Sequence, residues 1–136
     1  MNTRNCFKCS DCPLTLEGLK AARTFRNKSA KVHVTLCSSA PQAFPAAKAG
    51  VTYISLFVGR LDNIEQNGIS LISDIAQIYD NYGFATEILV ASVRHPMHIV
   101  ESALMGVRVE TIPFKVIRQL VQHPLTDKGL DSFVSD

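Results

Sequence analysis

The sequence predicts an α/β protein whose parallel sheet has about four strands, each followed by a helix. Two observations predict this fold class. Residues 51–58 are apolar at nearly every position, which is typical of a parallel strand covered on both faces. Segments with helical spacing alternate strictly with such strands, and this order indicates right-handed strand–helix–strand units. Four units form either a small open sheet or half of a (β/α)₈ barrel, because a complete barrel needs at least about 200 residues.

The composition excludes several classes of protein. The chain has 136 residues, of which 46% are hydrophobic and 19% charged, so a single packed domain is expected. A net charge of +2 without any block of basic residues predicts no nucleic-acid partner. No apolar run is long enough for a membrane span or a secretory signal, so we expect a cytoplasmic protein without a membrane partner.

The first orderly elements begin after Pro13. Thr15 is a good helix cap, and Leu16, Leu19 and Ala22 would share the inner face of the helix that follows. Residues 31–37 alternate as a strand, with Val32, Val34 and Leu36 on one face and with His33, Thr35 and Cys37 on the other.

A second helix is expected from Ser39 to Ala49, with Pro45 inside it at a cost of about 3 kcal/mol. The apolar strand over residues 51–58 then ends at Gly59, directly before Arg60. The later elements are predicted as a helix over 69–82, a strand over 87–93, a helix over 96–106, a short strand over 107–112, and helices over 114–122 and 125–134. In the helix over 114–122 we expect four side chains to point inward: Val116, Ile117, Leu120 and Val121.

The first twelve residues fit no helical or strand period. Cys6, Cys9 and Cys12 have a C-x-x-C-x-x-C spacing that resembles part of a zinc or iron–sulfur ligand set. No fourth ligand lies near them in the sequence. We therefore expect an irregular segment over residues 1–12 and no metal site, with a cysteine-based site as the alternative.

Four polar residues lie at or near the carboxyl ends of predicted strands, where α/β proteins bind ligands. These are Thr35, Arg60, Ser92 and Arg94. Two guanidiniums and a hydroxyl predict a site for a phosphate monoester. Alternatives remain open, since Arg60 could form a surface ion pair with Asp62 and threonine is a common strand residue.

Eight motifs in one order resemble the transaldolases, and above all the small bacterial subgroup that includes fructose-6-phosphate aldolase. The resemblance runs from Pro13 to Asp136. The motifs are Thr15-x-Glu-Gly-Leu-Lys-Ala21, Val34-Thr-Leu36, Gln42-Ala43, Ala47-x-Ala-Gly50, Phe57-Val-Gly-Arg-Leu-Asp62, Ala91-Ser-Val-Arg-His-Pro96, Thr111-Ile-Pro113 and His123-Pro-Leu-Thr-Asp127.

The resemblance implies a TIM barrel that transfers a dihydroxyacetone unit between sugar phosphates through a lysine Schiff base, in pentose phosphate metabolism and without a cofactor. It also implies that Arg60 and Ser92 bind the substrate phosphate with Arg94 beside them. By the same resemblance Thr35 positions a catalytic water, and Phe57 lines the pocket.

The chain departs from the family at the reacting lysine. The family has Lys-Ile-Pro where this sequence has Asp11-Cys-Pro13, so a carboxylate stands at the lysine position. Lys8 is three residues away, and His33 replaces an asparagine of the family. A carboxylate cannot form an imine, so we expect an inactive aldol site.

Residues 13–136 resemble the C-terminal half of the barrel, whereas residues 1–12 resemble no part of the family. We therefore expect a truncated copy whose exposed sheet edges favour self-association. The alternatives to a transaldolase are a non-catalytic module that binds sugar phosphates and a lyase of the fructose-6-phosphate aldolase type.

Overall fold

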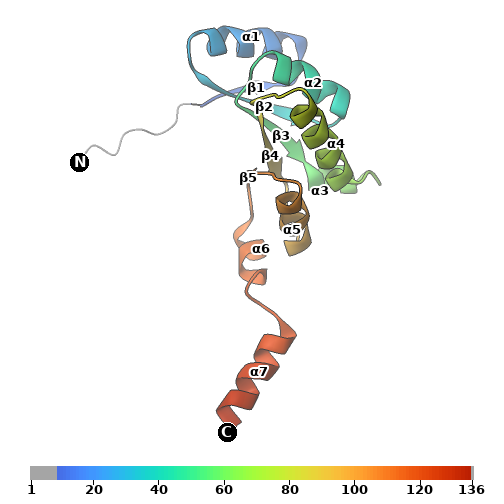
Figure 1. The fold of residues 1–136 in the computed structure, drawn as a ribbon, viewed down its shortest axis with the longest axis vertical. Coiled ribbons are helices and arrows are strands. Elements are labelled where there is room, and N and C mark those ends of the chain that lie inside the picture. The colour runs from blue at the N-terminus through green and yellow to red at the C-terminus, as the bar shows by residue number, and fades with distance from the viewer. Residues whose placement is uncertain (1–8, 136) are drawn as a thin grey trace, which may run out of the picture.

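The computed structural model describes residues 9–135 and confirms the predicted α/β class (Figure 1). Five parallel strands lie in the order in which they follow one another in the chain: β1 Cys9–Pro13, β2 Lys31–Cys37, β3 Tyr53–Phe57, β4 Glu87–Ala91 and β5 Val109–Glu110. The helices are α1 Leu16–Asn27, α2 Ala40–Lys48, α3 Val58–Asp62, α4 Gly68–Asn81, α5 Pro96–Leu104, α6 Phe114–Gln119 and α7 Pro124–Ser135. None of the helices within residues 9–135 is long and apolar enough to cross a bilayer.

The sequential strand order determines where the helices lie. Each right-handed crossover returns to the next strand on the same side, so α1, α2, α4 and α5 gather along one face of the sheet (Figure 1). The opposite face corresponds to the lumen of a barrel. In the described residues the sheet is open, with β1 at one edge and β5 at the other, as in part of a TIM barrel.

Strand β1 occupies part of the segment that the sequence analysis expected to be irregular. It pairs with β2 from Cys9 opposite Lys31 to Pro13 opposite Thr35. The segment lacks an apolar pattern because it is an edge strand with polar side chains, and Pro13 is tolerated at its end. Residues 1–8, with Cys6 and Lys8, lie outside the described residues, and the predicted domain boundary stays a prediction.

A bulge in β2 changes the predicted alternation. The register with β3 shifts between Val34 and Cys37, and Leu36 has a backbone φ of 68°. Leu36 is therefore half exposed, while Cys37 is buried on the helix-covered face. The prediction that Leu36 points inward with Val34 is wrong, because one extra residue in a strand reverses the faces of all that follow.

Helix α2 continues through Pro45, despite the cost that the sequence analysis expected there. The element has only nine residues, and Pro45, the sixth of them, removes one backbone donor. Packing compensates for this loss. Ala43, Ala46 and Ala47 are buried, and the hydroxyl of Tyr79 in α4 donates a hydrogen bond of 2.8 Å to the carbonyl oxygen of Ala43.

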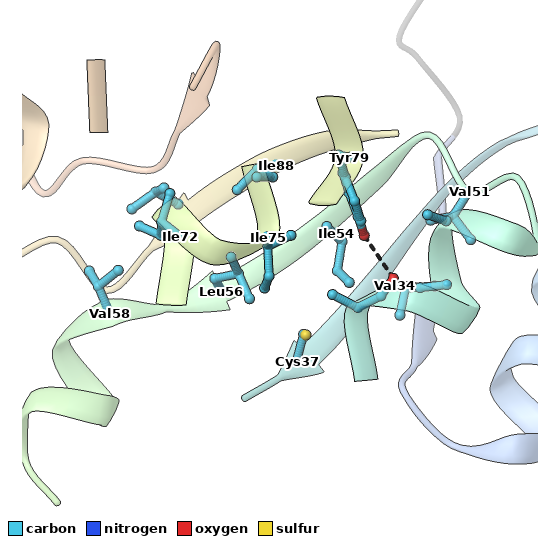
Figure 2. Close-up of a cluster of buried hydrophobic side chains, with 14 of the residues drawn as sticks. Val34, Cys37, Val51, Ile54, Leu56, Val58, Ile72, Ile75, Tyr79 and Ile88 are labelled. Carbon is cyan, nitrogen blue, oxygen red and sulfur yellow. Dashed lines mark hydrogen bonds between the residues drawn. The ribbon is translucent and has the colours of Figure 1, made fainter. Parts of the chain in front are cut away.

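The hydrophobic core lies between the sheet and α2 and α4 (Figure 2). Ile54 and Leu56 of β3 are fully buried there against Ile72 and Ile75 of α4. Because alternate residues of a strand point to opposite faces, Ser55 between them points to the face opposite the helices.

Candidate functional site

The carboxyl end of β3 and the segment after β4 lie in close contact. Helix α3 begins directly after β3 and contains Gly59 and Arg60. A Cβ atom added at Gly59 would lie 2.4 Å from the carbonyl oxygen of Ser92 and 2.5 Å from Nε of Arg94. Only glycine therefore allows this approach, which brings three of the predicted phosphate-binding residues to one place.

Arg60 and Arg94 are both exposed, and each contacts a neighbouring side chain. The guanidinium carbon of Arg60 lies 4.4 Å above the ring centroid of Phe57, a cation–π contact that orients the side chain. Arg94 donates a hydrogen bond of 2.6 Å from Nη1 to Oδ1 of Asn63. Each guanidinium has five donors, so both keep donors for an anion.

Ser92 has an unusual backbone conformation for a residue other than glycine. Its φ is 61°, directly after the end of β4. Such a conformation costs of order 1–3 kcal/mol and persists where the surrounding structure imposes it. The carbonyl of this residue packs directly against Gly59.

The sequence analysis assigned no part of the site to His98. His98 is 4% exposed and joins three segments around the site. Its Nδ1 accepts a hydrogen bond of 3.3 Å from the backbone N–H of Arg94, and its Nε2 lies 3.2 Å from Oδ2 of Asp62 in α3. Asp62 also accepts a bond of 3.2 Å from the N–H of Gly68. No spacing in the sequence signals this role, because Asp62 and Arg94 belong to separate segments.

This network predicts that acid destabilises the protein through His98. Burial lowers the pKa of His98 below its ordinary value of 6.5 and His95 lowers it further, whereas Asp62 and Glu101 oppose the shift. The unfolded chain therefore takes up the proton more readily, so stability is full above pH 6.5 and falls as the pH drops toward the lowered pKa.

Urea unfolding at several pH values between about 7.5 and 5 measures this loss. A His98→Gln variant should lose less stability on acidification than the unsubstituted protein. The exposed His123 provides the control, since His123→Gln should keep the parental pH dependence. If the free energy of unfolding fell equally with pH in the His98 variant and in the parent, the predicted role of His98 in acid destabilisation would be contradicted.

Thr35 lies on β2, the neighbour of β3 in the sheet. It is half-buried in the bulged part of β2, and its carbonyl oxygen accepts a bond of 2.9 Å from the N–H of Leu14. Asp11, at the position where the family has lysine, lies on β1 opposite His33. Its Oδ1 lies 2.8 Å from Nδ1 of His33, so the carboxylate is held by the imidazole.

Two of the three cysteines with the metal-like spacing can be placed. Cys9 and Cys12 are three positions apart on β1, so their side chains point to opposite faces of the sheet. Burial raises the pKa of both thiols, which disfavours the thiolate that metals bind. Within residues 9–135 no group of three or more histidine, cysteine or acidic side chains is arranged to hold a metal ion.

Two hollows flank the strand ends. One of about 430 Å³ adjoins α3 and is lined by Asp62, Glu65, His95 and His98, among others. The other, of about 620 Å³, lies at the opposite ends of the strands, beside Glu87 and Arg108. The lining of the smaller hollow includes neighbours of the predicted phosphate-binding residues in the sequence, but not Arg60, Ser92 or Arg94 themselves.

Comparison with known proteins identifies close relatives. The sequence model of the family described as "Transaldolase/Fructose-6-phosphate aldolase" matches residues 12–135. A protein named "Probable transaldolase" from Anaeromyxobacter dehalogenans is 60% identical over 124 residues, which are 91% of this chain and 57% of the relative. A protein of the same name from Prosthecochloris aestuarii is 58% identical over 125 residues, with 92% and 56% covered. The chain thus spans little more than half the length of these curated relatives.

Solved structures show likeness in fold alone. A mutant flavocytochrome b2 with benzoylformate matches with a TM-score of 0.57 at 14% identity, over 69% of this chain and 26% of the other. A mutant mandelate oxidase matches with a TM-score of 0.52 at 15% identity, over 69% and 29%. In both, the part that resembles this chain is about a quarter of a longer polypeptide.

Proposed function

Since the chain belongs to the transaldolase and fructose-6-phosphate aldolase family, we propose that it binds the phosphate of a sugar phosphate between Arg60, Ser92 and Arg94. The substrate class is that of carbohydrate metabolism, in the pentose phosphate pathway by resemblance. Phe57 and Thr35 would line the sugar end of the pocket, in a cytoplasmic protein that needs no cofactor.

The close contact at Gly59 is the main support for this proposal. Because Gly59 has no side chain, α3 can approach Ser92 and Arg94 closely. The backbone positions of Arg60 and Arg94, two exposed arginines from separate segments, are therefore close to each other. Charge-assisted hydrogen bonds from a pair of arginines are strong and match the geometry of phosphate oxygens. A surface ion pair between Arg60 and Asp62 has less support, because Asp62 is bound to His98 and Gly68 instead.

We further propose that this chain does not cleave or transfer the sugar through an imine. Asp11 stands where the family has the reacting lysine, and its carboxylate is engaged by His33. A carboxylate offers no amine, so neither transaldolase nor lyase chemistry follows from this strand. The function that remains is non-catalytic binding of the sugar phosphate.

Titration calorimetry with fructose 6-phosphate tests the phosphate site. Arg60→Ala should weaken binding by about 1.5–3 kcal/mol, because it removes charge-assisted hydrogen bonds. Arg60→Lys should recover part of the loss, since it keeps the charge without the planar fork. Arg108→Ala is the matched control: Arg108 is exposed at the opposite strand ends, 3.9 Å from Glu87, and its loss should leave binding unchanged.

Equal affinity in the parent and in Arg60→Ala would discard the phosphate site. Borohydride treatment in the presence of fructose 6-phosphate tests the second proposal separately. A sugar adduct on any lysine, found by mass spectrometry, would refute the absence of imine chemistry and leave the phosphate site standing.

The arrangement also supports self-association through the exposed sheet edges. β1 and β5 have neighbours on one side only in the described residues. Beyond β5, α6 and α7 extend away from the sheet (Figure 1). These helices and the residues between them expose a run of large apolar side chains: Phe114, Ile117, Leu120, Val121, Leu125, Leu130, Phe133 and Val134. The sequence analysis expected Ile117, Leu120 and Val121 to point inward, which is wrong. An apolar surface of this kind favours contact with another protein surface.

A further inference from the structure

Three polar side chains from neighbouring strands meet on the face of the sheet opposite the helices. His33 lies between Val32 and Val34, and Ser55 between Ile54 and Leu56, all four of which are fully buried in the core. Strand alternation therefore directs His33 and Ser55 to the other face. Asp11 is the register partner of His33 on β1, so it shares that face.

The hydrogen bonds among Asp11, His33 and Ser55 indicate which atoms carry the protons. Oδ1 of Asp11 lies 2.8 Å from Nδ1 of His33, and a carboxylate only accepts, so Nδ1 carries the proton. The neutral imidazole then has its lone pair on Nε2, which is hydrogen-bonded to Oγ of Ser55. In that neutral form Oγ donates its proton to Nε2. Carboxylate, imidazole and hydroxyl stand in the roles of a nucleophilic serine, its base and the group that orients the base.

We propose that Asp11, His33 and Ser55 form a nucleophilic serine site that cleaves small activated esters. The proposal goes beyond sugar-phosphate binding and does not depend on it, because Arg60, Ser92 and Arg94 take no part. All three side chains stand on strands, so the backbone ladders of β1, β2 and β3 hold their spacing. A nucleophile, its base and the group that orients the base need rigid placement of this kind.

The reaction proceeds in two balanced steps. Oγ of Ser55 attacks the acyl carbon and passes its proton to Nε2 of His33, while Asp11 stabilises the imidazolium. The bond from the acyl carbon to the leaving oxygen breaks, and that oxygen takes the proton from Nε2 of His33, so the leaving group departs as an alcohol or phenol and the imidazole is neutral again. Water then attacks the acylated serine with His33 as base, which releases the acid and restores the hydroxyl.

Burial limits the size of the acyl group. Ser55 is 2% exposed, whereas the His33 side chain is 21% exposed and that of Asp11 73%. The exposure of the three side chains to solvent thus decreases from Asp11 at the sheet edge toward Ser55, so a substrate has little room at the nucleophile. We accordingly assign the site to acetyl-sized groups on good leaving groups and exclude long acyl chains.

Hydrolysis of p-nitrophenyl acetate by the purified full chain tests the assignment. We expect a burst of p-nitrophenol with acetyl bound to Ser55, and both should disappear in Ser55→Ala. His33→Asn should lower the rate at least about tenfold because it removes the base. Asp11→Asn should do the same while Ser55 stays in place, because an amide that donates to Nδ1 would move the imidazole proton to Nε2. Ser73→Ala, at an exposed serine of α4, should keep the parental rate.

Peptide mapping after phenylmethanesulfonyl fluoride treatment gives a second measurement that does not need turnover. A label on Ser55 that requires His33 and Asp11 supports the site. Each variant is compared at equal folded fraction, which urea unfolding determines. A label confined to lysines or cysteines, or a rate unchanged in both His33→Asn and Asp11→Asn, would overturn the proposal. Either result would leave the phosphate-binding proposal unaffected, because that proposal is measured with Arg60→Ala.

Discussion

A Gly59→Ala variant should be less stable than the parent by about 2–3 kcal/mol, the upper range for an atom forced into a filled space. The added Cβ would lie 2.4 Å from the carbonyl oxygen of Ser92 and 2.5 Å from Nε of Arg94. The arginine side chain can move aside, but the carbonyl belongs to the backbone that follows β4. Relief therefore requires the loop with Ser92 and Arg94 to move away from α3. Urea unfolding measures the loss of stability.

Gly129→Ala is the matched control for this prediction. Gly129 lies within α7, where an added Cβ would meet nothing within 4 Å. Alanine at such a position should leave stability unchanged or raise it by up to about 1 kcal/mol, because glycine is a poor helix former. A Gly59→Ala variant as stable as Gly129→Ala would contradict the close contact. A destabilised variant that still binds fructose 6-phosphate normally would separate the fold from the proposed phosphate site.

The same contact explains which parts of the site could be predicted from sequence. The proximity of the segments that carry Arg60, Ser92 and Arg94 could be predicted, because buried strands are easy to recognise and their carboxyl ends meet at one edge of a parallel sheet; their role in phosphate binding stays a prediction. The position of Thr35 within the bulge could not be predicted, because a bulge leaves no signal in a strand that alternates normally. His98 was missed since its partners, Asp62 and the Arg94 amide, come from segments that only the fold brings together.

The sequence predicted the class of the fold but not all of its strands. Alternating apolar strands and helices predicted the class, but β1 was missed because an edge strand with polar side chains has no apolar period. The link from Asp11 through His33 to Ser55 depends on the register of three strands, which no spacing in the sequence specifies. Local patterns thus predict elements and strand ends, whereas contacts between strands require the structure.

The core should be most sensitive at the middle strand, and we expect Ile54→Ala to lower the free energy of unfolding by about 2–5 kcal/mol. Ile54 is fully buried between the sheet and α4, close to Ile75 and Tyr79 (Figure 2). β3 pairs with strands on both sides, so its neighbours cannot collapse into the cavity without disturbing β2 or β4. The cost therefore includes the cavity as well as the lost burial of apolar surface.

Two further variants separate a cavity effect from a general loss of side chain. Ile54→Val removes one methylene group and should cost about 0.5–1.5 kcal/mol, so the two losses at Ile54 should be graded by volume. Leu104→Ala should change stability by no more than about 0.5 kcal/mol, because Leu104 is 82% exposed at the end of α5. Urea unfolding of all three variants gives the comparison. Equal losses for Ile54→Ala and Leu104→Ala would show that the helices do not seal this face of β3.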